Sequence, residues 1–347
     1  MKFSFATFAS ATLTIGTLAL RPDFELKGYA TLGGGTTGGA GGTVTNVTTR
    51  DELLAAVKGH SPKIIYVLGN VGGNTTTRMS VGNNTCASST TEETVPTLKL
   101  GHRSIIGVGS SAIVEGGGFS INKASNVIIR NLIIRKVVNN DGITVLRSNN
   151  VWIDHNEFHS DTEHGFDYYD GQVDITLGSD YVTLSWNKFH DHYKSSLIGS
   201  SEKNGAMDTG HFKITYHHNS WNNVHTRTPA LRFGTVHIYN NLIENVVSQG
   251  VHTRSFGQVL VEANVFRNVT EPISTYGFVI PDDSPINPEG DYEPDGFANE
   301  RINLYIGSGK NNITQVGNFT SVPYSFKADS PYLVKAIVDK YSGVGKI

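Results

Sequence analysis

The sequence has very little cysteine and little charge. Cys86 is the single cysteine among 347 residues, so no disulfide can form within the chain. Charged residues make up only 17%, and the net charge of −3 excludes a generally basic surface of the kind that binds nucleic acid. No apolar run after the N-terminus is long enough to cross a membrane. Stability must therefore come from a large core, and any attraction for an anionic ligand has to be local.

The N-terminus departs from this polar composition. Lys2 precedes a run of apolar and small residues over 3–20, and Thr17-Leu18-Ala19 offers a cleavage site. We therefore predict a signal peptide over 1–19, a single domain over 20–347, and secretion. Six Asn-X-Ser/Thr sequons fit a secreted glycoprotein. They begin at Asn46, Asn74, Asn83, Asn268, Asn312 and Asn318.

One short template recurs along most of the chain. Each copy is a β-branched run, then asparagine, then an aromatic or aliphatic residue. The copies cover residues 126–135, 149–158, 179–189, 212–221, 235–243 and 257–266. Such a recurrence predicts a solenoid whose parallel strands stack about 4.8 Å apart. Buried asparagines at one turn of each coil would hydrogen-bond to one another as a ladder. The expected ladder is Asn131, Asn156, Asn187, Asn219, Asn241 and Asn264.

Three segments flank or interrupt the repeats. Thr49 and Glu52 form a capping box, which predicts a short helix over 49–58 that covers the N-terminal end of the solenoid. The residues from 272 to 300 are rich in Pro, Asp and Gly, and we expect a long loop that walls one side of a cleft. Apolar residues at helical spacing predict a second helix over 329–341, packed on the outside or the far end.

Acidic residues recur within the repeats. Asp154 and Asp174 are 20 residues apart, Lys194 follows after another 20, and Asp170 precedes Asp174 by four. In stacked coils, residues about one coil apart become neighbours on one face. Aspartates offer only oxygen ligands, which hard cations such as Ca²⁺ prefer, and carboxylates held so close together would repel without a cation. A calcium site is therefore the preferred interpretation over a plain acidic face.

Basic residues follow in the next part of the chain. Pro229 fixes the backbone between Arg227 and Arg232, and guanidinium groups bind carboxylates through two parallel hydrogen bonds. Together with Lys194, the two arginines would form a positively charged cluster that faces the aspartates. The ligand that fits is a polyanion whose carboxylates bridge metal and arginine. The alternative is that both arginines form ordinary surface ion pairs.

Four ordered motifs carry a resemblance to a known family. WIDH (152–155), DYYDGQVDIT (167–176), DHYKSSLIG (191–199) and RTPALRFGTVHIYNN (227–241) resemble the pectate lyase family, and GYATLGGGTTGGAGG (28–42) is similar to the start of its secreted fungal members. The resemblance implies an all-β right-handed parallel β-helix, with the short N-terminal capping helix and long loops on one face.

The resemblance also implies an activity and a set of roles. The reaction would be β-elimination across a 1,4-linked galacturonan, with Ca²⁺ as cofactor and polygalacturonate or pectin as partner. By position, Asp154, Asp170 and Asp174 would be calcium ligands. Lys194 and Arg232 would bind substrate carboxylate, and Arg227 would be the catalytic base. We expect a monomer that contacts neither nucleic acid nor membrane.

Three alternatives remain at this stage. A pectin lyase would act on methyl-esterified polymer without calcium, but it would be expected to replace Asp170 or Asp174 with a basic residue. A hydrolase on a similar solenoid needs a pair of catalytic carboxylates and does not need the cluster of arginines and lysine. A non-catalytic polysaccharide-binding solenoid could have lost Arg227, which is present here.

Overall fold

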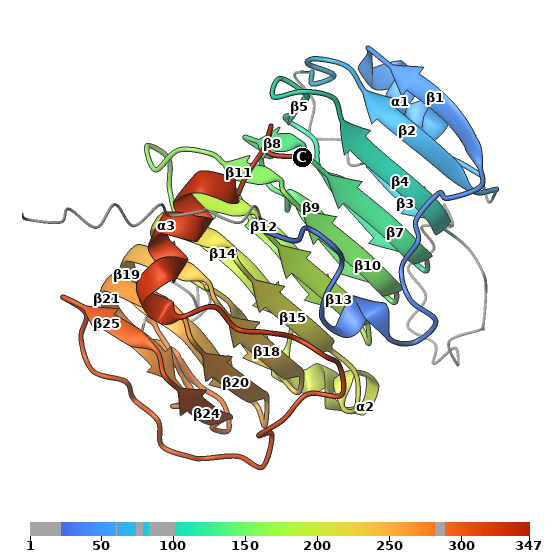
Figure 1. The fold of residues 1–347 in the computed structure, drawn as a ribbon. Helices are drawn as coiled ribbons and strands as arrows, with labels where there is room; N and C mark the ends of the chain where they lie inside the picture. The colour runs from blue at the N-terminus through green and yellow to red at the C-terminus, as the bar shows by residue number, and fades with distance from the viewer. Residues whose placement is uncertain (1–21, 60, 74–78, 83–100, 282–288) are drawn as a thin grey trace, which may run out of the picture.

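The computed structural model describes residues 22–59, 61–73, 79–82, 101–281 and 289–347. The predicted signal peptide, Cys86 and the sequons at Asn74 and Asn83 lie outside these residues. The described chain winds through two long parallel sheets, which confirms the expected solenoid (Figure 1). Each further coil adds strands to both sheets, so the chain progresses steadily from one end of the molecule to the other (Figure 1).

We call the ten-stranded sheet "sheet A" and the thirteen-stranded sheet "sheet B". Sheet A contains β1 (Thr43–Val47), β2 (Lys63–Val67), β4 (Gly101–Gly107), β7 (Ser125–Arg130), β10 (Asn149–Asp154), β13 (Asp180–Ser185), β15 (Lys213–His217), β18 (Thr235–Tyr239), β20 (Gln258–Glu262) and β24 (Phe297–Arg301). Sheet B contains β3 (Met79–Gly82), β6 (Phe119–Asn122), β9 (Ile143–Leu146), β12 (Gly171–Thr176), β14 (Lys188–Ile198), β16 (Ser220–Thr226), β19 (Leu242–Arg254), β21 (Val265–Ser274) and β25 (Leu304–Ile306), with the shorter β5 (Ile113–Glu115), β8 (Ile133–Arg135), β11 (Glu157–His159) and β17 (Ala230–Arg232).

The core between the sheets is built from rows of side chains in register. Strand pairing in sheet A aligns one inward residue from each coil, and every member of this row is fully buried. The row is Ile105, Ile129, Ile153, Leu184, Tyr216, Ile238 and Val261. β-branched residues suit these positions because their stiff side chains pack well on a pleated surface. The alternation of the sequence template therefore becomes one continuous core along the solenoid axis.

The asparagine ladder is confirmed for five of its six predicted members and extends one coil further, to Asn303. Neighbouring side chains are joined by Nδ2–Oδ1 hydrogen bonds of 2.9–3.1 Å from Asn156 to Asn303. The prediction for Asn131 is wrong. Strand pairing places Leu132, not Asn131, beside Asn156. Asn131 instead donates to the carbonyl oxygens of Gly107 and Gly109.

The flanking elements match their predictions in kind, with two differences. Helix α1 (Arg50–Ala56) begins with the expected capping box and lies beside β1 at the N-terminal end (Figure 1). Helix α3 (Pro331–Tyr341) packs Val334 and Val338 against Leu242 and Val265, on the outside of the sheets. Within the described part of 272–300 the expected loop contains regular structure, because β22 (Phe278–Val279) and β23 (Asp291–Tyr292) pair as an antiparallel hairpin and β24 begins before residue 300. The structure also adds α2 (Gly205–Asp208) and two 3₁₀ turns, η1 (Tyr29–Thr31) and η2 (Glu202–Asn204).

None of the helices in the described ranges is long and apolar enough to pass through a bilayer.

Substitution of one ladder asparagine, Asn219, tests how much the asparagine ladder stabilises the fold. Asn219 donates to the Leu184 carbonyl and to Asn241, and it accepts two hydrogen bonds from Asn187. Because Asn219→Ala leaves these buried partners unsatisfied, we expect the free energy of unfolding to fall by about 2–4 kcal/mol. The matched control is Asn222→Ala, because Asn222 is exposed on β16. Urea unfolding of both variants measures the difference, and equal losses would contradict a structural role for the ladder.

Candidate functional site

Three neighbouring strands of sheet B bring distant acidic residues together. Pairing of β9, β12 and β14 aligns Thr144, Asp174 and Leu197 in one row. Asp141 lies two residues before β9, and Asp170 lies directly before β12. Because the strands are parallel and adjacent, the start of β12 lies beside the start of β9 and beside Lys194 in the middle of β14.

Two of these carboxylates share a tightly packed corner. Asp174 is buried, and its Oδ1 accepts a hydrogen bond from the Leu197 N–H at 3.1 Å. Asp141 accepts one from the Gly171 N–H at 3.0 Å and another from the Thr144 hydroxyl. A Cβ atom added to Gly171 would lie 2.4 Å from Oδ1 of Asp174 and 3.0 Å from Oδ1 of Asp141. Glycine at position 171 therefore leaves the space into which both carboxylates point.

We call Asp141, Asp170 and Asp174 the acidic corner, because their negative charges act on one another. Burial raises the pKa of Asp174 well above its ordinary value, and the negative charges of Asp141 and Asp170 raise it further. The positive charge of Arg227 acts in the opposite direction. Two more carboxylates so close to a buried one favour either protonation or a bound cation.

Cationic side chains come from β14 and from the residue that follows β16. Lys194, on β14, is largely buried, and its Nζ lies 2.6 Å from Oδ1 of Asp167 and 3.4 Å from Oδ1 of Asp170. Arg227 follows β16 with a left-handed backbone (φ 66°), and its carbonyl accepts a hydrogen bond from the Ser196 N–H. Asp170, Asp174, Lys194 and Arg227 are therefore brought together, as the sequence predicted.

Arg232 is engaged differently. Its guanidinium donates through Nε and Nη2 to the two carboxylate oxygens of Glu293, at 2.8 and 2.5 Å, and through Nη1 to the Gly199 carbonyl at 2.8 Å. Glu293 belongs to the segment predicted to wall a cleft, and no pattern in the sequence indicates this pairing.

The expected grouping of Asp154 with Asp170 and Asp174 is wrong. Asp154 ends β10 in sheet A, whereas Asp174 lies in sheet B. Its buried carboxylate is bonded to Arg130 Nε at 2.6 Å, the Ser185 hydroxyl at 2.6 Å and His155 Nδ1 at 2.7 Å. The residues beside it in sheet A are 24 and 31 positions away in sequence, so a spacing of 20 does not mark one coil.

Asp141 is the residue that sequence reasoning missed, although a signal was present. An Asp-Gly pair precedes β9 as Asp141-Gly142, and another precedes β12 as Asp170-Gly171. The two pairs stand next to each other, because the Gly142 N–H donates to the Gly171 carbonyl. Aligning the repeats on these pairs would have pointed to Asp141.

Comparisons with known proteins identify the family. The family model described as pectate lyase matches residues 1–347. A probable pectate lyase A of Aspergillus fumigatus is 41% identical over 338 residues, which cover 96% of this chain and 93% of that protein.

This chain belongs to the pectate lyase family.

Other pectate lyase relatives agree with this assignment. A pectate trisaccharide-lyase of Bacillus licheniformis is 34% identical over 342 residues, covering 98% of this chain and 92% of that protein. A pectate lyase of Bacillus sp. N165, solved in complex with trigalacturonate, has a TM-score of 0.76 at 31% identity and covers 93% of this chain and 99% of that one. The chain is therefore a polysaccharide lyase, and its fold is the right-handed parallel β-helix that the resemblance implied.

The residues present fit a hard cation of the kind expected for this pectate lyase site. Asp141, Asp170 and Asp174 offer only oxygen donors, and Gly171 leaves the space between two of them clear. In the described ranges, no three His, Cys, Asp or Glu side chains are already arranged as a metal cage. Asp170 lies near Lys194 instead, so a cation would have to compete with the ammonium group for this carboxylate.

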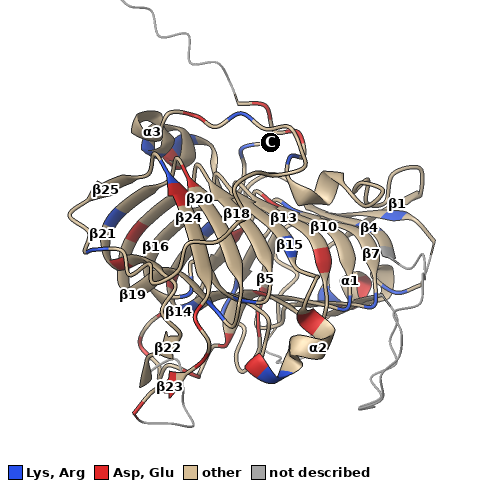
Figure 2. Cartoon of the chain, turned by 90° about the horizontal axis from the view of Figure 1, so that it is seen from below, with Lys and Arg blue, Asp and Glu red and all other residues tan. Residues whose placement is uncertain are grey.

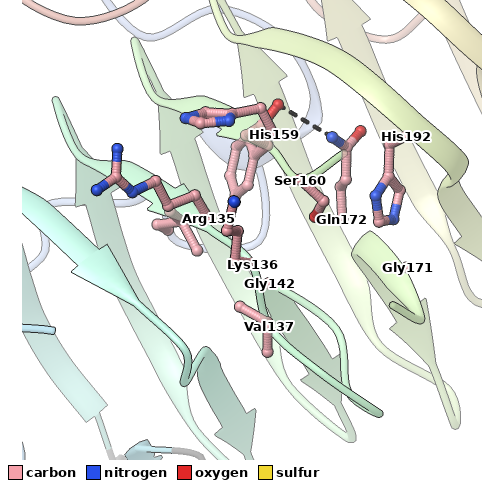
Figure 3. A pocket seen from close by; sticks show the side chains of 11 residues that line it. Arg135, Lys136, Val137, Gly142, His159, Ser160, Gly171, Gln172 and His192 are labelled. Carbon is pink, nitrogen blue, oxygen red and sulfur yellow. Dashed lines mark hydrogen bonds between the residues drawn. The ribbon is translucent and has the colours of Figure 1, made fainter. Parts of the chain in front are cut away.

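A buried histidine supports the backbone of this corner. His192 lines a small pocket with Gly142, Gly171 and Gln172 (Figure 3). Burial lowers the pKa of His192 to about 4, so the ring is neutral at pH 7. Its Nε2 lies 2.7 Å from the Asp170 carbonyl oxygen and donates to it, which holds the backbone at Asp170.

Gly171 allows a direct test of the corner. In Gly171→Ala the new Cβ would displace the carboxylate of Asp174, and we expect the Ca²⁺ affinity to fall roughly tenfold or more. The matched control is Gly165→Ala, because a Cβ there meets no atom within 4 Å. Calorimetric titration with Ca²⁺ measures both. Equal affinities for Gly171→Ala and wild type would show that a cation does not bind between these carboxylates.

Proposed function

We propose that this chain is a calcium-dependent pectate lyase that cleaves polygalacturonate by β-elimination and leaves a 4,5-unsaturated end. The observation that carries the proposal is the meeting of opposite charges on adjacent coils of sheet B. The carboxylates of Asp141, Asp170 and Asp174 lie close together, Lys194 contacts Asp170, and the charge of Arg227 acts on Asp174. A cation held by the aspartates, together with Lys194, would neutralise a substrate carboxylate bound at this site.

The difficulty of the reaction is the C5–H bond, because an adjacent ionised carboxylate makes this proton very weakly acidic. When bound, Ca²⁺ would supply positive charge beside the C6 carboxylate, which is electrostatic and Lewis-acid assistance. Lys194 would place its ammonium group near the same carboxylate and stabilise the charge that develops there.

Arg227 is the residue we assign to remove the C5 proton. The electron pair of the C5–H bond forms the C4=C5 double bond as the bond from C4 to the glycosidic oxygen breaks. That oxygen leaves with the departing chain and takes a proton from water. An ordinary arginine has a pKa above about 12, so we expect activity to rise with pH in the alkaline range.

Particular residues favour this proposal over the three alternatives. A calcium-independent pectin lyase would have no use for three acids around one corner. A hydrolase would need a pair of carboxylates to protonate the glycosidic oxygen and to activate water or attack the sugar, whereas Lys194 and Arg227 are basic. A non-catalytic binder would not require Arg227 beside Asp174.

We further propose that the protein is secreted as a monomeric single domain over residues 20–347. The support for secretion is the apolar start of the sequence after Lys2, together with the sequons. Asn46, Asn268 and Asn318 are exposed in the structure, as glycosylation would require.

The first test is the reaction itself. Polygalacturonate incubated with the protein and Ca²⁺ should gain ultraviolet absorbance from new C=C bonds, and a chelator should stop the gain. In Arg227→Ala we expect kcat to fall by roughly 10²- to 10⁴-fold because the proton acceptor is gone. Reducing ends that appear without the absorbance would mean hydrolysis. Activity that survives chelation on esterified pectin would favour a pectin lyase.

A second test compares Asp141 and Asp154 as calcium ligands, because the sequence predicts Asp154 and the structure favours Asp141. Asp141→Asn should weaken Ca²⁺ binding roughly tenfold or more, because a charged oxygen donor is lost. Asp154→Asn should leave Ca²⁺ affinity unchanged and lower the unfolding midpoint, because it breaks the buried pair with Arg130. Calorimetry and thermal unfolding measure the two effects. The reverse pattern would restore Asp154 to the metal site.

A further inference from the structure

The hairpin that follows β21 reaches back to Arg232 through one buried carboxylate. Figure 2 shows β22 and β23 projecting from the body of the solenoid. Glu293 follows β23, and its N–H donates to the Gly277 carbonyl at 2.9 Å. Its side chain is only 4% exposed. Besides the two bonds to Arg232, it lies 3.2 Å from Arg254 Nε and accepts the Ser255 hydroxyl at 2.6 Å.

This carboxylate remains ionised. Burial raises the pKa of Glu293, but the hydrogen bonds from Arg232, the charges of Arg254 and Arg232, and the bond from Ser255 together hold the pKa below its ordinary value. One negative charge therefore stands against two guanidinium groups. All three nitrogens of the Arg232 guanidinium group already donate hydrogen bonds within the protein. Nε and Nη2 donate to Glu293, and Nη1 donates to the Gly199 carbonyl.

Arg232 lies on the same face of sheet B as the acidic corner. Asp174 is aligned with Leu197, and Leu197 with Ala230. Arg232 is two residues after Ala230 in β17, and residues two apart in a strand point to the same face. The charge of Arg232 is therefore directed toward the face where the polymer would bind, and Glu293 offsets it there.

The same hairpin segment contributes aromatic rings. Tyr276, Phe278 and Tyr292 lie in mutual contact, with ring centroids 4.9–6.5 Å apart. Tyr276 and Tyr292 are exposed. Aromatic faces attract apolar groups such as a methyl ester and give nothing to an anion.

We propose that Glu293 is a specificity-determining residue that lets the enzyme accept methyl-esterified galacturonate at the subsite beside Arg232. By cancelling one guanidinium charge, Glu293 removes the requirement for an ionised carboxylate at that position, and the rings on the same hairpin suit a neutral unit. This inference rests on the proposed function and concerns which units of the same polymer the site takes.

The experiment compares Glu293→Gln with wild type on two substrates, fully de-esterified polygalacturonate and partly methyl-esterified pectin, with Ca²⁺ at low salt. Glutamine keeps the shape and one acceptor but removes the charge. We expect the ratio of kcat/KM for polygalacturonate over that for pectin to rise about tenfold, the scale for one unit charge acting over roughly 10–15 Å near a protein surface. The change should appear in KM, with little change in kcat, and should shrink as salt is added.

Two further variants separate specificity from folding. Asp291→Asn removes the same charge from an exposed position of the same hairpin and should leave the ratio at the wild-type value. Glu293→Asp keeps the charge and should also keep the wild-type ratio, even if the unfolding midpoint falls. An unchanged ratio in a folded Glu293→Gln, or an equal shift in Asp291→Asn, would overturn the inference. If Glu293→Gln does not fold, a shifted ratio in Glu293→Asp overturns it instead. Wild-type protein that produces no unsaturated ends from either substrate would refute the proposed function itself.

Discussion

The register between β9, β12 and β14 is the constraint on which the site depends. Backbone hydrogen bonds between parallel strands fix which residues of successive coils meet, and a shift of one residue would turn each side chain to the opposite face. Here the register places Asp141 and Asp174 at one corner, with Gly171 between them, and aligns Lys194 with Thr226 on the next strand, directly before Arg227. The candidate site, whose residues from Asp141 to Arg227 span nearly 90 positions of the sequence, therefore depends on backbone pairing.

The stacking of successive coils is also supported by the asparagine ladder. Each ladder side chain bonds to the next coil and to a backbone carbonyl of the coil before, so its buried amide is satisfied. The acidic corner has the opposite character. Asp174 is buried beside other acids, and its raised pKa reflects a cost to the fold without a cation. A rigid stack of coils can hold such a corner in place because the core rows on either side do not depend on it.

Features that repeat in the sequence could be predicted from it. The solenoid, the helix capped by Thr49 and Glu52, and five ladder asparagines follow from local patterns that recur or carry their own capping signal. Asp170, Asp174, Lys194 and Arg227 were expected together because they stand in motifs that resemble the pectate lyase family.

Other features depend on which strand pairs with which. A constant spacing of 20 misplaces Asp154, because each coil contains strands of both sheets and inserted loops vary its length. Asn131 was placed in the ladder by a template that is offset by one residue there. The bond between Arg232 and Glu293 joins residues 61 positions apart, through a hairpin outside the repeats, so no periodic signal marks it.

The measurement that tests the central claim most directly is a crystal structure of the protein grown with Ca²⁺, with anomalous scattering used to locate the ion. The account predicts one calcium peak bonded to oxygens of Asp141, Asp170 and Asp174, with Arg227 and Lys194 facing it. A calcium ion bound at Asp154, or no ion among the three aspartates at millimolar calcium, would contradict it.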